Sequence, residues 1–98
     1  MRIHHIAIWT FRLEEMKEFY IRYFKGTGNE KYVNPQKGFE SYFIRFDSGA
    51  DLELMSRTDV RDTPIEENRV GLTHFAFTFP SQEEVLRFTE QMRSEGYS

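Results

Sequence analysis

A motif of histidine, apolar residue, alanine and apolar residue occurs twice in this chain of 98 residues, and it constrains the fold most strongly. The first copy begins at His5 and the second at His74, 69 positions later. Further matches in the same register need no gap between residues 2 and 20: Ala7 with Ala76, Glu14 with Glu83, Glu15 with Glu84, and Phe19 with Phe88. Self-similarity at a fixed spacing indicates a duplicated unit. We therefore interpret the chain as two copies of one module.

Hydrophobic patterning assigns secondary structure to each copy. We expect strands at 3–10, 40–47, 51–56 and 72–79, a short irregular strand within 29–35, and helices at 12–25 and from 82 to about 94. Gly26 and Gly28 are expected to end the first helix, and Ser48–Asp51 to form a tight hairpin turn with Tyr42, Ile44 and Phe46 sharing one face of the strand before it. Ser81, with Glu84 three residues later, predicts a capping box at the second helix.

The order of these elements predicts an α+β fold within a single domain. Residues 1–56 form a complete βαβββ module, and residues 57–70, which are polar and contain Pro64, form a surface linker. Residues 71–98 form a second module that is truncated after its helix. Paired modules with one and a half copies present leave a sheet edge and an apolar face open, so we expect a homodimer.

Strand alternation places one histidine from each copy on the same kind of face. Side chains of a strand alternate between two faces, and the apolar rows are expected to face the helices. His5, Glu53 and His74 all fall on the opposite row, whereas His4 falls on the helix side and is interpreted as structural. An ionised carboxylate beside Leu52 and Leu54 is costly unless it is paired or coordinated. Two imidazoles and one carboxylate that converge suit Zn, Ni, Co, Mn or Fe.

Each of these residues also has an ordinary interpretation. A single histidine on a strand is commonly a polar residue at a partly wet position. Glu53 could be an edge-strand carboxylate in water, or the partner of Arg45 or Arg57. The repeat favours the metal interpretation, because it makes two of the three residues the same position in two modules.

Composition excludes several classes of function. The net charge is −3 and the basic residues are scattered, which argues against nucleic acid or an anionic membrane as partner. The chain has no cysteine, so disulfides, thiolate metal sites and cysteine nucleophiles are excluded. No apolar run approaches membrane-spanning length, and nothing at the N-terminus resembles a secretory signal. We expect a cytoplasmic protein.

Four stretches together resemble the vicinal oxygen chelate superfamily, which contains glyoxalase I, bleomycin-resistance proteins and extradiol dioxygenases. They are H-H-I-A-I-W-T followed by E-E-M-K-E-F-Y, then K-G-F-E-S-Y-F-I-R-F, then D-L-E-L-M, and finally G-L-T-H-F-A-F-T-F. The resemblance covers the whole chain and implies paired βαβββ modules whose sheets form a cup around a divalent metal ion. His5, Glu53 and His74 match the first three of four ligands, in the order His, Glu, His, Glu.

The resemblance also bounds the activity. The fourth ligand falls 69 positions after Glu53, beyond Ser98, so we expect either a piece of a longer protein or a shortened one. It is also the expected proton shuttle of glyoxalases, which leaves Glu53 as the candidate base here. Trp9 stands where glutathione-dependent members tend to carry arginine, which argues against glutathione as substrate.

Two functions therefore stand as hypotheses. The first is a metal-dependent lyase or isomerase of the glyoxalase type, acting on a small substrate with neighbouring oxygens. The second is a non-catalytic small-molecule binding protein of the drug-sequestering, bleomycin-resistance type. The residues expected to contact the small molecule in either case are Trp9, Phe43, Arg45 and Met55. Core positions for Trp9 and Phe43, a surface position for Arg45, and a bare dimerisation domain are the alternatives.

Overall fold

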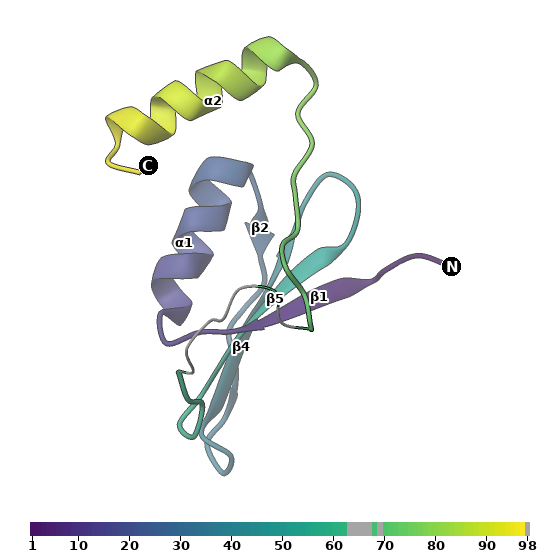
Figure 1. The fold of residues 1–98 in the computed structure, drawn as a ribbon. Coiled ribbons are helices and arrows are strands. Elements are labelled where there is room, and N and C mark those ends of the chain that lie inside the picture. The colour runs from purple at the N-terminus through teal and green to yellow at the C-terminus, as the bar shows by residue number, and fades with distance from the viewer. Residues whose placement is uncertain (63–67, 69, 98) are drawn as a thin grey trace. The chain divides into compact units, whose positions relative to one another are not determined.

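The first unit of the molecule, Met1–Pro64, is a five-stranded sheet with one helix packed against one of its faces (Figure 1). The structure is a computed structural model that describes residues 1–62, 68 and 70–97. The elements of this unit are β1 (His5–Trp9), α1 (Leu13–Phe24), β2 (Thr27–Gly28), β3 (Tyr32–Asn34), β4 (Phe39–Arg45) and β5 (Asp51–Arg57). This is the βαβββ order that the sequence predicts, with one additional short strand.

The sheet is built around β4 and β5, which pair with each other in antiparallel fashion. β1 lies beside β5 and runs parallel to it, while β2 and β3 both pair with β4 in antiparallel fashion. The segment 29–35, in which one irregular strand is expected, contains β3. The additional strand β2 lies before this segment, at Thr27–Gly28. The predicted hairpin turn is a five-residue connection, residues 46–50, in which Gly49 has a φ of 80°. That value lies in the left-handed region that glycine adopts without strain.

Helix α1 ends at Phe24, two residues before the predicted Gly26. The left-handed position at its C-cap is Lys25, with a φ of 56°, and the N–H of Gly26 donates to the carbonyl of Tyr20 at 3.2 Å. Gly26 is needed for a different reason: a Cβ atom there would clash with the side chain of Ile44 on β4. The glycine therefore lets the end of the helix approach the sheet closely. Gly28 lies further along, in β2.

The core lies between α1 and the sheet. Its buried apolar members are Leu13, Tyr42, Ile44, Leu52 and Leu54. Ile44 and Leu54 are fully buried, and each such side chain stabilises the fold by about 1.5–3 kcal/mol relative to an exposed one. The alternation that the sequence predicts for β4 and β5 is confirmed by the four strand residues of this core, Tyr42, Ile44, Leu52 and Leu54, which share the face toward the helix.

A polar network at the edge of this core links α1 to β4. The hydroxyl of Tyr42 donates to Oε1 of Glu14 on α1 at 2.6 Å. The Nζ of Lys31 lies 2.8 Å from Glu40 and 3.7 Å from Glu14. The hydrogen bond to Glu14 raises the pKa of Tyr42, and the hydrogen bond to Glu40 raises the pKa of Lys31. α1 covers one face of the sheet, and no described helix or strand of the first unit packs on the other face.

The second unit, Ile65–Ser98, contains the helix α2 (Gln82–Ser94). The Ser81 half of the predicted capping box is confirmed, because Oγ of Ser81 accepts the N–H of Glu84 at 3.2 Å, and the helix ends at Ser94 as expected. The predicted strand at 72–79 is wrong, since that segment belongs to no sheet in the described part of the chain. A strand is stable only when a neighbour supplies ladder hydrogen bonds, and the described residues of this unit include no other strand.

The predicted linker, residues 57–70, is described by the structure only in part. Arg57 belongs to β5, and residues 63–67 and 69 lie outside the described residues. The assignment of residues 71–98 to a partial second module of one domain stays a prediction. No helix among the residues described is long and apolar enough to cross a bilayer.

Candidate metal centre and open face of the sheet

The register of the three longest strands determines which side chains share the face opposite α1. Ala7 of β1 lies beside Glu53 of β5, and Phe43 of β4 lies on the other side of Glu53. We call this surface the open face. Its members, by alternation from those three, are His5, Ala7 and Trp9 from β1, Asp51, Glu53, Met55 and Arg57 from β5, and Phe39, Ser41, Phe43 and Arg45 from β4.

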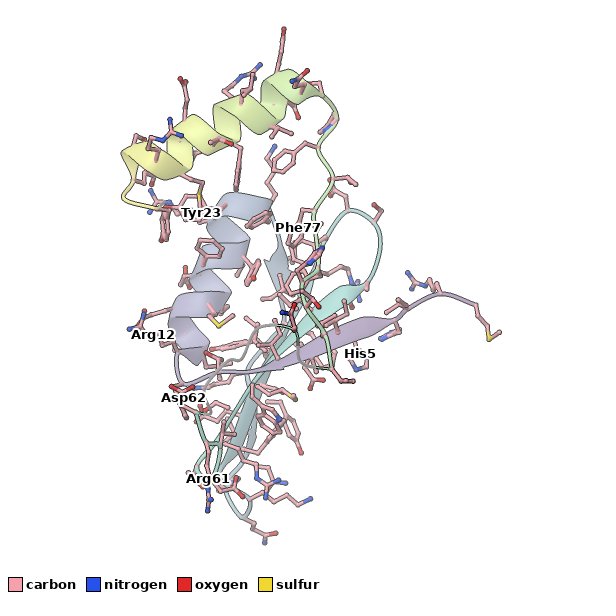
Figure 2. All side chains as sticks on the ribbon, viewed as in Figure 1. His5, Arg12, Tyr23, Arg61, Asp62 and Phe77 are labelled. Carbon is pink, nitrogen blue, oxygen red and sulfur yellow. The ribbon has the colours of Figure 1, made fainter. Side chains whose placement is uncertain are left out.

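Two of the predicted metal ligands meet on this face. Nε2 of His5 lies 3.6 Å from Oε1 of Glu53, and the two side chains are 39% and 16% exposed. His5 is the first residue of β1, and Figure 2 labels its side chain there. Ala7, directly beside Glu53, carries only a methyl group and so leaves the space above the carboxylate to larger neighbours. The sequence prediction that His5 and Glu53 share one face is thus met by the geometry.

The chemistry of this pair suits a divalent metal ion. Their separation of 3.6 Å is longer than a hydrogen bond. The Glu53 side chain is only 16% exposed, so its carboxylate is largely shielded from water and is not directly hydrogen-bonded to the imidazole. A shielded carboxylate and an imidazole nitrogen are ligand types that Zn and its neighbours in the first transition row accept. Within residues 1–62, no third His, Cys, Asp or Glu joins the two in a group that could hold a metal ion. The first unit therefore offers two ligands.

His4 also contributes to this site, which the sequence analysis did not foresee. Its Nδ1 lies 2.9 Å from Nδ1 of His5, and the two rings meet edge to face at 86° with centroids 5.1 Å apart. Strand alternation assigned His4 to the helix side, but β1 begins only at His5, so the alternation rule does not apply to it. The adjacent histidine pair was the signal in the sequence.

A row of aromatic rings lies on the open face near Trp9, at the end of β1 opposite His5. Trp9 meets Phe39 at a centroid distance of 6.1 Å, and Phe39 meets Tyr32 of β3 at 5.9 Å. Trp9 is 48% exposed and Tyr32 55% exposed, so Trp9 does not take the core position considered from the sequence. We call Trp9, Phe39 and Tyr32 the aromatic row. Only Trp9 was expected from the sequence, because the other two come near it through strand pairing: Phe39 through the pairing of β4 with β5, and Tyr32 through the pairing of β3 with β4.

The remaining predicted residues are distributed as follows. Phe43 packs edge to face against the His5 ring, with centroids 5.3 Å apart, and Met55 is the β5 neighbour of Trp9. Arg45 is exposed at the end of β4, two residues from Phe43. Glu53 is not paired with Arg57, because Nε of Arg57 binds Oδ1 of Asp59 at 2.8 Å.

His74, the third predicted ligand, belongs to the second unit. It lies in the segment 72–79 and is exposed. Its role as a ligand stays a prediction.

Comparison with known protein families shows the family to which the chain belongs. A model of the Glyoxalase/Bleomycin resistance protein/Dioxygenase superfamily matches residues 2–98. The chain belongs to this superfamily. No curated protein matches it.

Solved structures confirm the glyoxalase-like fold. The crystal structure of SMU.1112c has a TM-score of 0.75 and 19% identity, over 95% of this chain and 75% of that one. The trypanothione-dependent glyoxalase I of Leishmania major has a TM-score of 0.69 and 19% identity, over 97% of this chain and 66% of the enzyme. This chain thus spans about two thirds of that glyoxalase. At these identities the likeness shows the fold alone.

Proposed function

We propose that this member of the glyoxalase superfamily binds a divalent metal ion through His5 and Glu53, and acts as a lyase or isomerase on a small substrate with two neighbouring oxygen atoms. The observation that carries the proposal is the 3.6 Å approach of His5 Nε2 to Glu53 Oε1 on the open face. His74, the same position in the second copy of the motif, is proposed as a third ligand.

In this proposal each residue of the candidate site has a defined role. When bound, the ion supplies electrostatic stabilisation to negative charge that develops on the substrate oxygens. Glu53 takes the proton from the carbon next to those oxygens, since it is a carboxylate, the kind of side chain that serves as a general base. Arg45 pairs with an anionic group of the substrate. Phe43, Met55 and Trp9 form the walls that hold the substrate and exclude water.

Metal titration of the purified chain tests the proposal. Metal-free protein is titrated with Co²⁺, whose visible absorption reports its ligands, and with Zn²⁺ in competition. We expect one ion per chain and at least about tenfold weaker binding in His5→Ala and in Glu53→Gln, because each removes a ligand. Asp51→Asn is the matched control, since Asp51 is a carboxylate of the same strand and face that the proposal does not use. Absence of binding in the wild type, or equal binding by all variants, contradicts the proposal.

The aromatic row supports a second candidate function, the binding of small molecules without catalysis. Trp9 is the only tryptophan of the chain and is 48% exposed, so its fluorescence reports occupancy of the row directly. Anilinonaphthalene sulfonate, an aromatic anion, is titrated in the presence of EDTA. Saturable quenching that Phe39→Ala weakens, in a protein that binds no Co²⁺, favours sequestration. Quenching that requires the metal favours the enzyme.

We also propose that the protein forms homodimers that complete the cup. The open face carries exposed aromatic residues, and among the described residues β1 is an edge strand that pairs only with β5. Surfaces of both kinds favour association with a second copy. Sedimentation velocity at micromolar concentration should give the mass of a dimer, and a single species with the mass of one chain would contradict this.

A further inference from the structure

The imidazoles of His4 and His5, just before and at the start of β1, approach each other through their Nδ1 atoms. The Nδ1 atoms of His4 and His5 lie 2.9 Å apart, which is a hydrogen-bond distance. A neutral imidazole carries a hydrogen on one ring nitrogen and a lone pair on the other. One of the two Nδ1 atoms therefore donates and the other accepts.

The direction of this hydrogen bond decides what the far side of the His5 ring can do. If Nδ1 of His5 donates, its Nε2 keeps a lone pair on the side of Glu53. If Nδ1 of His4 donates, Nε2 of His5 carries the hydrogen and directs it toward the Glu53 carboxylate 3.6 Å away. Only the first arrangement presents a lone pair that can bind a metal ion.

His4 is held in place for this contact by its backbone. The N–H of Asp51, the first residue of β5, donates to the carbonyl of His4 at 2.9 Å. On its other side the His5 ring packs against Phe43 at a centroid distance of 5.3 Å. The His5 ring therefore contacts two rings, of which only His4 can accept a hydrogen bond from Nδ1.

We propose that His4 is a positioning residue: it accepts the hydrogen of His5 Nδ1 and so holds His5 in the tautomer and orientation that offer Nε2 to a divalent ion. The inference rests on the proposed function and adds to it a residue that touches neither metal nor substrate. Histidine ligands of metals commonly donate their second ring N–H to a carboxylate, a carbonyl or water. In this protein the acceptor is the neighbouring imidazole.

Two variants of His4 separate hydrogen bonding from mere packing. His4→Leu removes the acceptor at similar size, whereas His4→Asn retains an acceptor oxygen close to the position of Nδ1. We expect Co²⁺ affinity to fall about 10- to 100-fold in His4→Leu and to stay within about threefold of wild type in His4→Asn. Because His4 is exposed, the melting temperature of the metal-free protein should be equal in all three proteins.

Nitrogen-15 NMR of the imidazoles, in mildly alkaline buffer, provides a readout that is independent of affinity. The metal-free protein should show one protonated Nδ1 among His4 and His5. The Zn²⁺-loaded protein should show the hydrogen on Nδ1 of His5 and a lone pair on Nδ1 of His4. Two unprotonated Nδ1 atoms, or a direct bond from Nδ1 of His4 to the metal, would overturn the inference.

The failure of this inference is distinguishable from that of the proposed function. Tight Co²⁺ binding by the wild type and equally by His4→Leu overturns the role of His4 alone, and leaves His5 and Glu53 as ligands. No Co²⁺ binding by the wild type overturns the proposed function, and the inference with it. Equal weakening by His4→Leu and His4→Asn, together with a lower melting temperature, assigns His4 a structural role and also overturns the inference.

Discussion

Residues 5–9 and 74–78 share one sequence pattern but have different structures. The first is β1, which pairs along its whole length with β5. The second belongs to no sheet in the described part of the chain. The pattern of apolar and polar residues is nearly the same in both, so the difference lies in the neighbours. Alternation specifies which face of a segment is apolar, but a neighbouring strand must supply the hydrogen bonds that make it a strand.

The two helices show the same contrast. α1 begins with the buried Leu13 and closes over a core that includes two fully buried side chains, Ile44 and Leu54. α2 contains no buried residue, and Val85 and Leu86 are 42% and 60% exposed. Both helices are amphipathic in sequence, so amphipathicity alone does not produce burial. We conclude that the free energy of folding resides mainly in the first unit.

Hydrogen exchange should show the largest difference between the two units. Amides of β5 lie between β1 and β4, and their exchange requires the sheet to open. Amides of residues 72–76 lack this protection. We expect exchange in β5 to be slower by at least about a thousandfold, since local openings cost far less than opening of the core. Equal protection measured by NMR or mass spectrometry would show that 72–79 has a strand partner in solution.

A pair of leucine substitutions should sharpen the contrast in stability. Leu54→Ala removes a fully buried side chain and should lower the free energy of unfolding by about 2–5 kcal/mol. Leu86→Ala, the same change at a 60% exposed position of α2, should cost less than about 0.5 kcal/mol. Urea unfolding followed by the fluorescence of Trp9 measures both. Similar losses for the two variants would place part of the core at α2 and contradict the account.

A smaller effect is expected at the hydrogen bond that joins α1 to the sheet. The hydroxyl of Tyr42 donates to Glu14, which raises the pKa of Tyr42. A group whose pKa is raised on folding stabilises the fold fully below its ordinary pKa of about 10, and this stabilisation is lost as the pH rises through the raised value. Tyr42→Phe should therefore destabilise the protein at neutral pH, by less than Leu54→Ala does.

The pH dependence distinguishes this hydrogen bond from packing. The difference in melting temperature between wild type and Tyr42→Phe should shrink in alkaline buffer, because the wild type loses the bond when the phenol ionises. Tyr32→Phe, at a 55% exposed ring of the same sheet, is the control and should change stability little at any pH. A difference that stays constant from neutral to alkaline pH would assign the effect of Tyr42 to packing.

Most of the first unit was predictable from the sequence because its patterns and its partners coincide. The apolar rows of β4 and β5 face α1 as predicted. In the second unit the cap at Ser81 was predictable too, because it needs only a residue three positions away. The strand at 72–79 could not be predicted correctly, because pairing depends on another strand rather than on the segment itself. The left-handed position at the end of α1 is occupied by Lys25 and not by Gly26. The preference for glycine at helix ends therefore gave the wrong position, because Gly26 is instead required where the chain passes close to Ile44.

The candidate site was predictable where alternation alone decides it. His5 and Glu53 share a face because each belongs to a regular strand, and the register brings them together. His4 escaped prediction since it precedes the strand, where alternation gives no guidance. The place of Tyr32 in the aromatic row depends on the pairing of β3 with β4, and the short β3 has no sequence pattern strong enough to specify that register.

Anomalous diffraction from crystals grown with Co²⁺ tests the central claim most directly. We predict a single strong peak in bonding contact with Nε2 of His5 and an oxygen of Glu53, and its loss in crystals of His5→Ala. A Co²⁺ peak bound elsewhere on the chain, or no peak beside these two side chains at saturating Co²⁺, would contradict the account.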